Sequence, residues 1–246
     1  HLAVTSARNI SVKVRHSIIE MPENDFQPRY DDPRVGYFLD QSTDQTTTSV
    51  IPYKDKINRW NLVKKDSSAL ISEPVEPIVF WMENTTPLPL RPIIKEAVER
   101  WNLAFEAAGF KNAVICNIQP DTATWDAGDI RYNVIRWTAS PKPPFGGYGP
   151  SFSNPRTGQI LGADIMLEWI YLTNRYKQGK IFNLAGLPLE NEEVEMNGKY
   201  HMCNQGEHLG ENLAFGKIVM DAYNFDEIQK DTFLVQCLME LVLHEV

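Results

Sequence analysis

Residues 231–246 read DTFLVQCLMELVLHEV, and this stretch is the most informative part of the chain about its fold. It predicts a helix with Asp231 or Thr232 as the N-cap and with apolar side chains on almost every side. A helix of this kind is usually buried at the centre of its domain. We therefore expect a central helix that ends in two ionisable residues, His244 and Glu245.

His244 and Glu245 need a chemical explanation, because burying an ionisable group is costly unless the group is paired or bound to a metal. They match the beginning of the zinc-peptidase pattern His-Glu-x-x-His. In that pattern two histidines one helical turn apart share a zinc ion, and the glutamate acts as a general base. The second histidine would lie two positions past Val246. A His-Glu pair on a solvated helix surface is the alternative interpretation.

The sequence before this helix predicts strands and a helix in alternation. Three stretches, at 75–82, 113–118 and 130–137, have the composition or the alternation of β-strands. Residues 92–108 place apolar side chains three and four positions apart, which predicts an amphipathic helix that stops at Gly109. This order is typical of a mixed sheet with helices packed on it, the α+β class.

A hairpin is expected between the third strand and the final helix. Its arms are residues 148–153 and 159–168, and the turn between them reads Asn-Pro-Arg-Thr-Gly. Pro150 is compatible with an edge strand if its missing N–H faces away from the neighbouring strand. A further helix is expected over 169–178, followed by an acidic connection with several Gly and Asn residues.

The N-terminal part has a different character. Residues 10–18 alternate between apolar and polar, which predicts a half-buried strand, and a second short strand is expected at 60–64. The stretch 65–74 reads as a boundary. We therefore divide the chain into a β-rich region over 1–72 and a second region over 73–246.

Charge and composition narrow the function. The net charge is −8 and no basic face is visible in the sequence, which argues against nucleic acid as a partner. No run approaches the roughly 20 apolar residues of a membrane span. The three cysteines, Cys116, Cys203 and Cys237, form no CxxC pair and leave the redox compartment open.

Two other groups of polar residues were weighed as metal sites. The first has no spacing typical of zinc, and a role on a surface or in a loop is the favoured interpretation. The second lacks the pattern of an EF-hand, which favours a solvated acidic loop. The first group is His201, Cys203, Glu207 and His208, and the second is Glu190, Glu192, Glu193 and Glu195.

Beyond these local patterns, the chain resembles a family of large bacterial zinc-dependent metallopeptidases of the metzincin type. The stretches that carry the resemblance are 27–29, 32–38, 73–79, 101–110, 129–137, 148–149, 154–158 and 243–246. They are spread over most of the chain in the expected order. The resemblance implies a zincin-like N-terminal subdomain, with a twisted mixed sheet and packed helices, preceded by a small β-rich segment.

The resemblance also implies a zinc site. The helix would continue to a second His, a Gly turn and a third His, with His244 as the first Zn²⁺ ligand and Glu245 as the general base. On this view the chain is expected to end inside the catalytic helix. By itself it would hold zinc weakly and would be inactive, whereas the full-length protein would hydrolyse peptide bonds.

The substrate would be a peptide or a protein. By analogy with metzincins, the arm that begins at Tyr148 would be an edge strand whose backbone pairs with an extended peptide. The substrate-binding residues would be Tyr148, Gly149, Pro150 and Ser151. An ordinary surface hairpin is the alternative for this arm.

Two other functional readings stay open. One is a catalytically inactive homologue that holds peptides as a surface module, and the other is a gluzincin-type hydrolase, in which a distant Glu replaces the third His. The family resemblance implies export to the periplasm, the cell surface or the medium.

Overall fold

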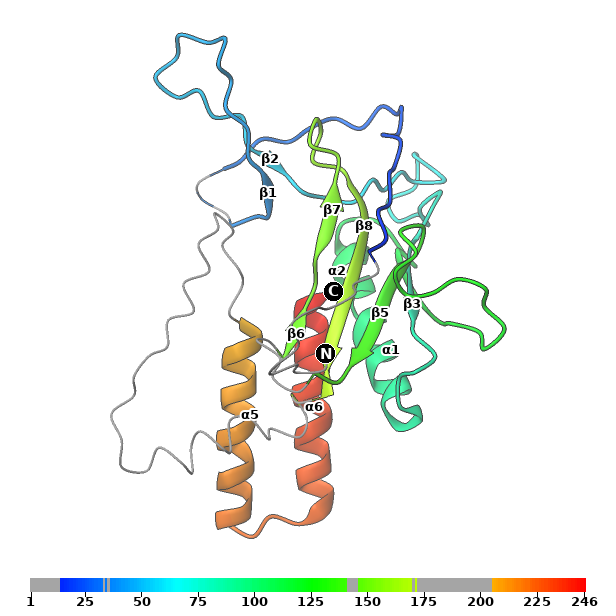
Figure 1. The fold of residues 1–246 in the computed structure, drawn as a ribbon, viewed down its shortest axis with the longest axis vertical. Helices are drawn as coiled ribbons and strands as arrows, with labels where there is room; N and C mark the ends of the chain where they lie inside the picture. The colour runs from blue at the N-terminus through cyan, green and yellow to red at the C-terminus, as the bar shows by residue number, and fades with distance from the viewer. Residues whose placement is uncertain (1–13, 33, 35, 141–145, 170, 172–204) are drawn as a thin grey trace, which may run out of the picture.

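The computed structural model describes residues 14–32, 34, 36–140, 146–169, 171 and 205–246 (Figure 1). Its centre is a six-stranded mixed sheet, and helices pack against that sheet. The predicted α+β class is therefore confirmed. Among the described helices, none combines the length and the apolar composition needed to cross a bilayer.

The sheet contains all the strands predicted after residue 73. Four neighbouring strands are parallel, and two short strands pair antiparallel with the last of them at the sheet edge. The parallel strands, in spatial order, are β4 (Val114–Ile118), β3 (Ile78–Met82), β5 (Asn133–Thr138) and β8 (Ile160–Glu168). The antiparallel strands are β6 (Gly147–Tyr148) and β7 (Ser151–Ser153).

One face of the sheet carries the hydrophobic core. Strand β3 buries Ile78, Phe80 and Met82, which alternate along the strand and therefore point to the same side. The core also includes Ile94 of α1 (Arg91–Glu99) and Leu241 of α6 (Glu227–Glu245). Burial of each such large side chain contributes roughly 1.5–3 kcal/mol. The expected central helix is thus part of the same core as the sheet.

The helix predicted over 92–108 is present as two short helices. After the 3₁₀ turn η1 (Leu88–Leu90), α1 is followed by α2 (Trp101–Ala107), with Arg100 between them still in the right-handed helical region. Gly109 has φ = +91°, a left-handed conformation that ends the helix at low steric cost.

The final helix begins earlier than the sequence predicted. Its N-cap is Asp226, whose carboxylate accepts the Gln229 N–H at 2.8 Å, while the Gln229 side chain accepts the Asp226 N–H at 3.1 Å. The prediction of Asp231 or Thr232 was wrong, because this reciprocal capping box satisfies the first backbone donors five residues upstream.

A helix that the sequence did not predict, α5 (Gln205–Ala222), runs beside α6 as an antiparallel neighbour (Figure 1). It buries Leu209 and Leu213. A Cβ at Gly216 would overlap the ring of Phe233 on α6, so glycine allows the two helices to approach closely. Residues 205–208 lie in this helix and not in a loop, as had been expected for that stretch.

Some predicted features fall partly or wholly outside the described residues. The acidic group at 190–195 and residues 201–204 lie outside them. Of the helix expected over 169–178, the structure describes residues 169 and 171, and both are helical.

The N-terminal part contains little regular structure among its described residues. Strands β1 (Leu39–Asp40) and β2 (Lys56–Ile57) pair antiparallel, and the strand expected at 60–64 is limited to an isolated bridge between Lys64 and Pro74. The half-buried strand predicted at 10–18 is wrong for residues 14–18, because Ile18 is 97% exposed and no partner strand meets it among the described residues.

The N-terminal part packs on the turn of the β7–β8 hairpin. Arg59 donates its N–H to the carbonyl of Gly158 at 3.0 Å and accepts the Ile160 N–H at 2.9 Å. Ser153 donates its hydroxyl to Asp40, with 2.7 Å between Ser153 Oγ and Asp40 Oδ2. The predicted turn is confirmed, since Gly158 has φ = +77° and donates its N–H back to Asn154 O at 2.8 Å.

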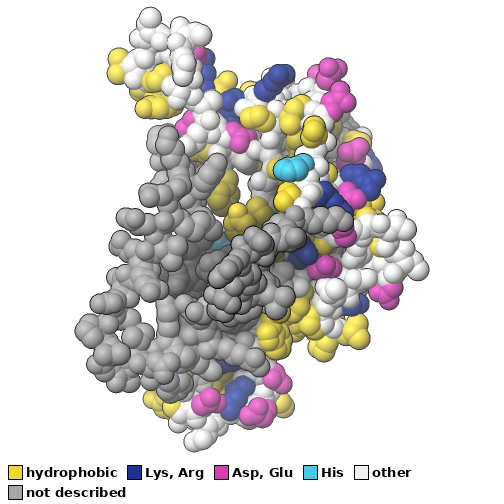
Figure 2. Space-filling view, viewed as in Figure 1, with side chains coloured by type: hydrophobic (Ala, Val, Ile, Leu, Met, Phe, Trp, Pro, Cys, Tyr) yellow, Lys and Arg dark blue, Asp and Glu magenta, His cyan; other side chains and the backbone are white. Residues whose placement is uncertain are grey.

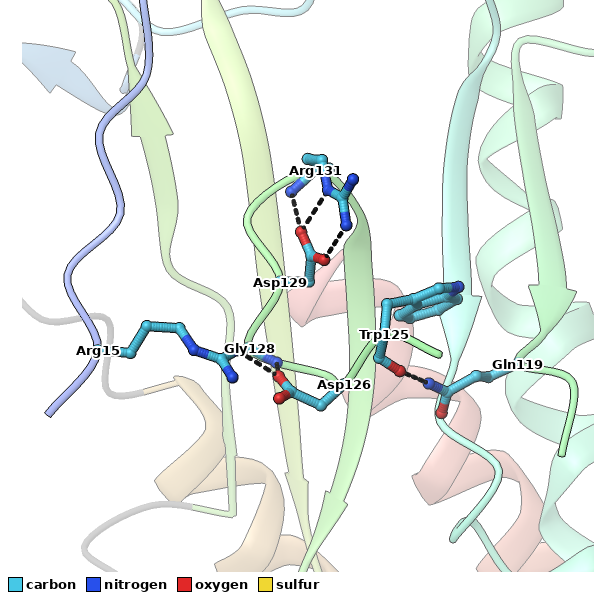
Figure 3. A network of polar contacts seen from close by, with 7 residues as sticks. All are labelled: Arg15, Gln119, Trp125, Asp126, Gly128, Asp129 and Arg131. Carbon is cyan, nitrogen blue, oxygen red and sulfur yellow. Dashed lines mark hydrogen bonds and ion pairs between the residues drawn. The ribbon is translucent and has the colours of Figure 1, made fainter. Parts of the chain in front are cut away.

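A polar network shapes the loop between β4 and β5 (Figure 3). Asp126 Oδ1 accepts a guanidinium N–H of Arg15 and the N–H of Gly128, both at 2.9 Å. The Arg131 guanidinium donates two hydrogen bonds to Asp129, at 2.9 and 2.6 Å, and lowers the pKa of that carboxyl to about 2. Because each charge in the network has an opposite partner, we interpret the network as structural.

The described surface carries charges of both signs. Figure 2 shows Lys and Arg side chains interspersed with Asp and Glu on the face in view.

Candidate active site

The last turn of α6 carries His244 and Glu245 and lies against β6 (Figure 1). Leu241 and Val242, which precede them, are fully buried. The indole N–H of Trp101, at the start of α2, donates to the carbonyl of Leu243 at 3.2 Å. The end of the helix is therefore held by the sheet on one side and by α2 on another.

The arm that includes β6 and β7 is one edge strand with a short interruption. Tyr148 pairs with Met166, and Ser151 pairs with Ala163, so a single register runs through both pieces. Pro150 accepts the Asp164 N–H at 3.0 Å. The backbone of Pro150 therefore faces β8, and the expectation that its missing N–H faces away was wrong.

The direction of the Pro150 backbone groups determines which way the backbone groups of its neighbours point. In an antiparallel pair, alternate residues turn both backbone polar groups to the partner strand. Gly146 and Pro150 both accept N–H groups from β8, so Gly147, Gly149 and Ser151 turn their backbone groups outward. Among the described residues, no strand pairs with this outer side. Within the described residues the arm is therefore the edge strand of the sheet, as the family resemblance implied.

Glu245 is placed at this edge. The outward N–H of Gly149 donates a hydrogen bond to its carboxylate. A Cβ built on Gly147 would lie 2.7 Å from Oε1 and 2.9 Å from Cδ of Glu245. Residues that are nearly a hundred positions apart in sequence therefore meet, and they include Glu245 and Gly149 of the predicted site.

The surroundings of Glu245 change its acidity. Partial burial raises the pKa of its carboxyl from 4.5 to about 7, and the Gly149 N–H opposes this rise in part. A carboxylate with a pKa near neutrality can both accept and release a proton at physiological pH. This is the property expected of a general base.

His244 occupies the neighbouring position on the helix and is exposed. It takes part in a further interaction within the chain. Among the described residues, no three His, Cys, Asp or Glu side chains lie close enough to hold a metal ion. The imidazole of His244 could serve as one ligand of a zinc site, with a carboxylate beside it, and the described residues supply no further ligand.

The other predicted substrate-binding residues lie along the same edge. Tyr148 is 37% exposed and Ser151 is exposed, so both are accessible on the arm. Sequence reasoning missed Gly147 and Trp101 as members of this site. Gly147 lies in a glycine-rich run with no chemical signal of its own, and Trp101 lies within the stretch that predicted an ordinary amphipathic helix.

Comparison with known protein families gives a match in the N-terminal part of the chain. Residues 2–65 match a protein family described as "Domain of unknown function (DUF5117)". The match lies within the N-terminal region and does not reach the edge arm or Glu245. No curated protein and no solved structure matches the chain.

Proposed function

We propose that the chain carries part of the catalytic domain of a zinc-dependent metallopeptidase of the metzincin type. The observation that supports this most strongly is the position of Glu245, a partly buried carboxylate with a pKa near 7, at the antiparallel edge of the sheet formed by the described residues. An extended peptide on that edge would lie next to a general base. The family resemblance, which includes residues 243–246, points to the same chemistry.

In this proposal the edge arm binds the substrate through backbone hydrogen bonds. The outward groups of Gly147 and Ser151 pair with an extended peptide, as in other cases of strand addition. Gly149, between them, presents Glu245 to the peptide bond opposite. Because backbone pairing reads no side chains, we expect this edge to contribute affinity and little selectivity.

The zinc site of the proposal begins with His244 as one imidazole ligand. The resemblance implies that two further histidines, following Val246 in the full-length protein, complete the ligand set. Zinc, when bound, would supply Lewis-acid polarisation of the attacking water and of the peptide carbonyl.

The role of Glu245 is to move one proton. Its carboxylate takes a proton from the attacking water and passes it to the leaving amine as the peptide bond breaks. The partial burial that raises its pKa favours uptake of that proton. Export from the cell is proposed on the family resemblance alone.

The test is bound zinc and peptide hydrolysis in the full-length protein, with Glu245→Gln and His244→Ala as paired variants. We expect close to one zinc per chain by elemental analysis in the wild type and in Glu245→Gln, and loss of zinc in His244→Ala. Hydrolysis of an unfolded, fluorescently labelled protein should fall by about 10²–10⁴-fold in Glu245→Gln, the usual contribution of a general base.

Two results would overturn the proposal. Absence of zinc from the wild type under zinc-replete conditions would remove the enzymatic reading. Zinc binding without hydrolysis would favour the inactive, peptide-binding homologue. In that case binding of an extended peptide to the edge arm would be measured next.

A further inference from the structure

We propose that Gly147 and Gly149 are positioning residues that seat Glu245 at the sheet edge. The inference rests on the proposed function for its catalytic meaning, and on geometry for the space that the two glycines leave for Glu245, which we call the seat. Gly147 begins β6 and Gly149 directly follows that strand, two positions further along the extended arm, so their missing side chains would point to the same face. That face meets the last turn of α6.

Each glycine makes room for a different part of Glu245. A Cβ on Gly147 would lie 2.7, 2.8 and 2.9 Å from Oε1, Cγ and Cδ of the Glu245 side chain. A Cβ on Gly149 would overlap the carbonyl oxygen of Glu245 and lie 3.2 Å from its carbonyl carbon. Gly147 therefore accommodates the side chain, and Gly149 accommodates the helix backbone.

The space at Gly147 decides which way the carboxylate points. With a methyl group there, the side chain of Glu245 must rotate away, because its Oε1, Cγ and Cδ atoms lie closer than real Cβ contacts allow. Rotation breaks the hydrogen bond from Gly149 N–H to the carboxylate. The helix can stay in place, since the three nearest atoms all belong to the Glu245 side chain and none to its backbone.

At Gly149 no side-chain rotation can relieve the clash. Its ideal Cβ meets backbone atoms of Glu245 and, at 3.1 Å, Cδ1 of Ile165 on β8. A methyl group there must push the end of α6 away from the sheet. The two substitutions to alanine should therefore differ, with Gly147→Ala misplacing the carboxylate and Gly149→Ala displacing the helix.

The experiment measures amide hydrogen exchange of this chain by NMR, in the presence of a chelator. In Gly147→Ala the Gly149 amide should exchange about tenfold faster or more, reaching the rate seen in Glu245→Ala, because both changes remove the same hydrogen bond. The double variant should show no additional increase. The Asp164 amide, which bonds to Pro150 on the inner side of the arm, should keep its protection.

A matched activity measurement in the full-length protein tests the positioning of Glu245 separately from the proposed peptidase activity. There, Gly147→Ala should lower kcat with little change in KM, since the peptide-binding edge is intact. Unchanged exchange at Gly149 in both Gly147→Ala and Glu245→Ala would overturn the seat. Faster exchange with no hydrolysis by the wild type would support the seat and overturn the proposed function.

Discussion

Glu245 lies in surroundings that favour its protonated form, and this has a consequence for stability. Burial raises the pKa of the carboxyl to about 7 in the folded protein, whereas the ordinary value is 4.5. Between these two pH values the folded state holds more protons than the unfolded state. The contribution of this group to the free energy of unfolding is therefore complete below about pH 4.5, and it is lost as the pH rises toward 7.

We predict that Glu245→Gln removes this decrease in the free energy of unfolding between pH 4.5 and 7. The metal-free wild type, studied with a chelator, should lose stability relative to Glu245→Gln between pH 4.5 and 7. Urea unfolding at a series of pH values measures the difference. Glu240→Gln, a change at an exposed carboxylate on the same helix, is the control. Parallel curves for the wild type and Glu245→Gln would contradict the prediction.

At the scale of the element, α6 depends on how it begins. The capping box of Asp226 and Gln229 satisfies the first backbone donors of a helix that carries Glu245 at its other end. Any loosening of α6 lowers the order of both ends, because helix formation is cooperative.

We predict that Asp226→Ala lowers the free energy of unfolding by about 1 kcal/mol, the usual cost of losing an N-cap. Asp231→Ala, at the position that the sequence suggested as a cap, should change it by less than about 0.5 kcal/mol. Urea unfolding followed by circular dichroism compares the two. Equal costs would mean that the helix begins elsewhere than at Asp226.

The elements predicted best were those with a strong period. Strands β3, β4, β5 and β8 were located because runs of β-prone or alternating residues have few other interpretations. Helix α5 was missed because Gly206, Gly210 and Gly216 lower its helix propensity. Its stability comes from packing on α6, where Gly216 receives the ring of Phe233. Such a tertiary contact has no signature in a local window.

The sequence named residues of the candidate site but not the geometry that brings them together. His244 and Glu245 were named from a motif, and the edge arm from the family resemblance. The contact of Gly147 with Glu245 could not be foreseen, since it depends on how α6 meets β6. The direction of the Pro150 backbone nitrogen was predicted wrongly, because the residues of a strand do not by themselves determine its register against the partner strand.

At the scale of the whole molecule, the N-terminal region supports the hairpin that forms the edge. Ser153, in β7, donates to both carboxylate oxygens of Asp40, at 2.9 and 2.7 Å, and accepts from Asn58 Nδ2 at 3.2 Å. All three side chains are partly buried. Asp40 and Asn58 thus join the N-terminal region by specific contacts to the substrate-binding arm of the proposal.

We predict that Ser153→Ala lowers the free energy of unfolding by roughly 1–3 kcal/mol, because it leaves a partly buried carboxylate without its partner. Ser151→Ala, a change at an exposed position on the same strand, should cost less than about 0.5 kcal/mol. Urea denaturation of both variants tests the difference. If the two variants are equally stable, Ser153 does not join the two regions.

The long sequence separation between the edge arm and Glu245 has a consequence for biosynthesis. Chains are made from the N-terminus, at about 5–20 residues per second, and early segments can fold first. The strands of the sheet and the arm leave the ribosome before the last turn of α6 does. The nascent sheet therefore spends several seconds with its apolar face uncovered by α6, a period in which chaperones would protect it from aggregation.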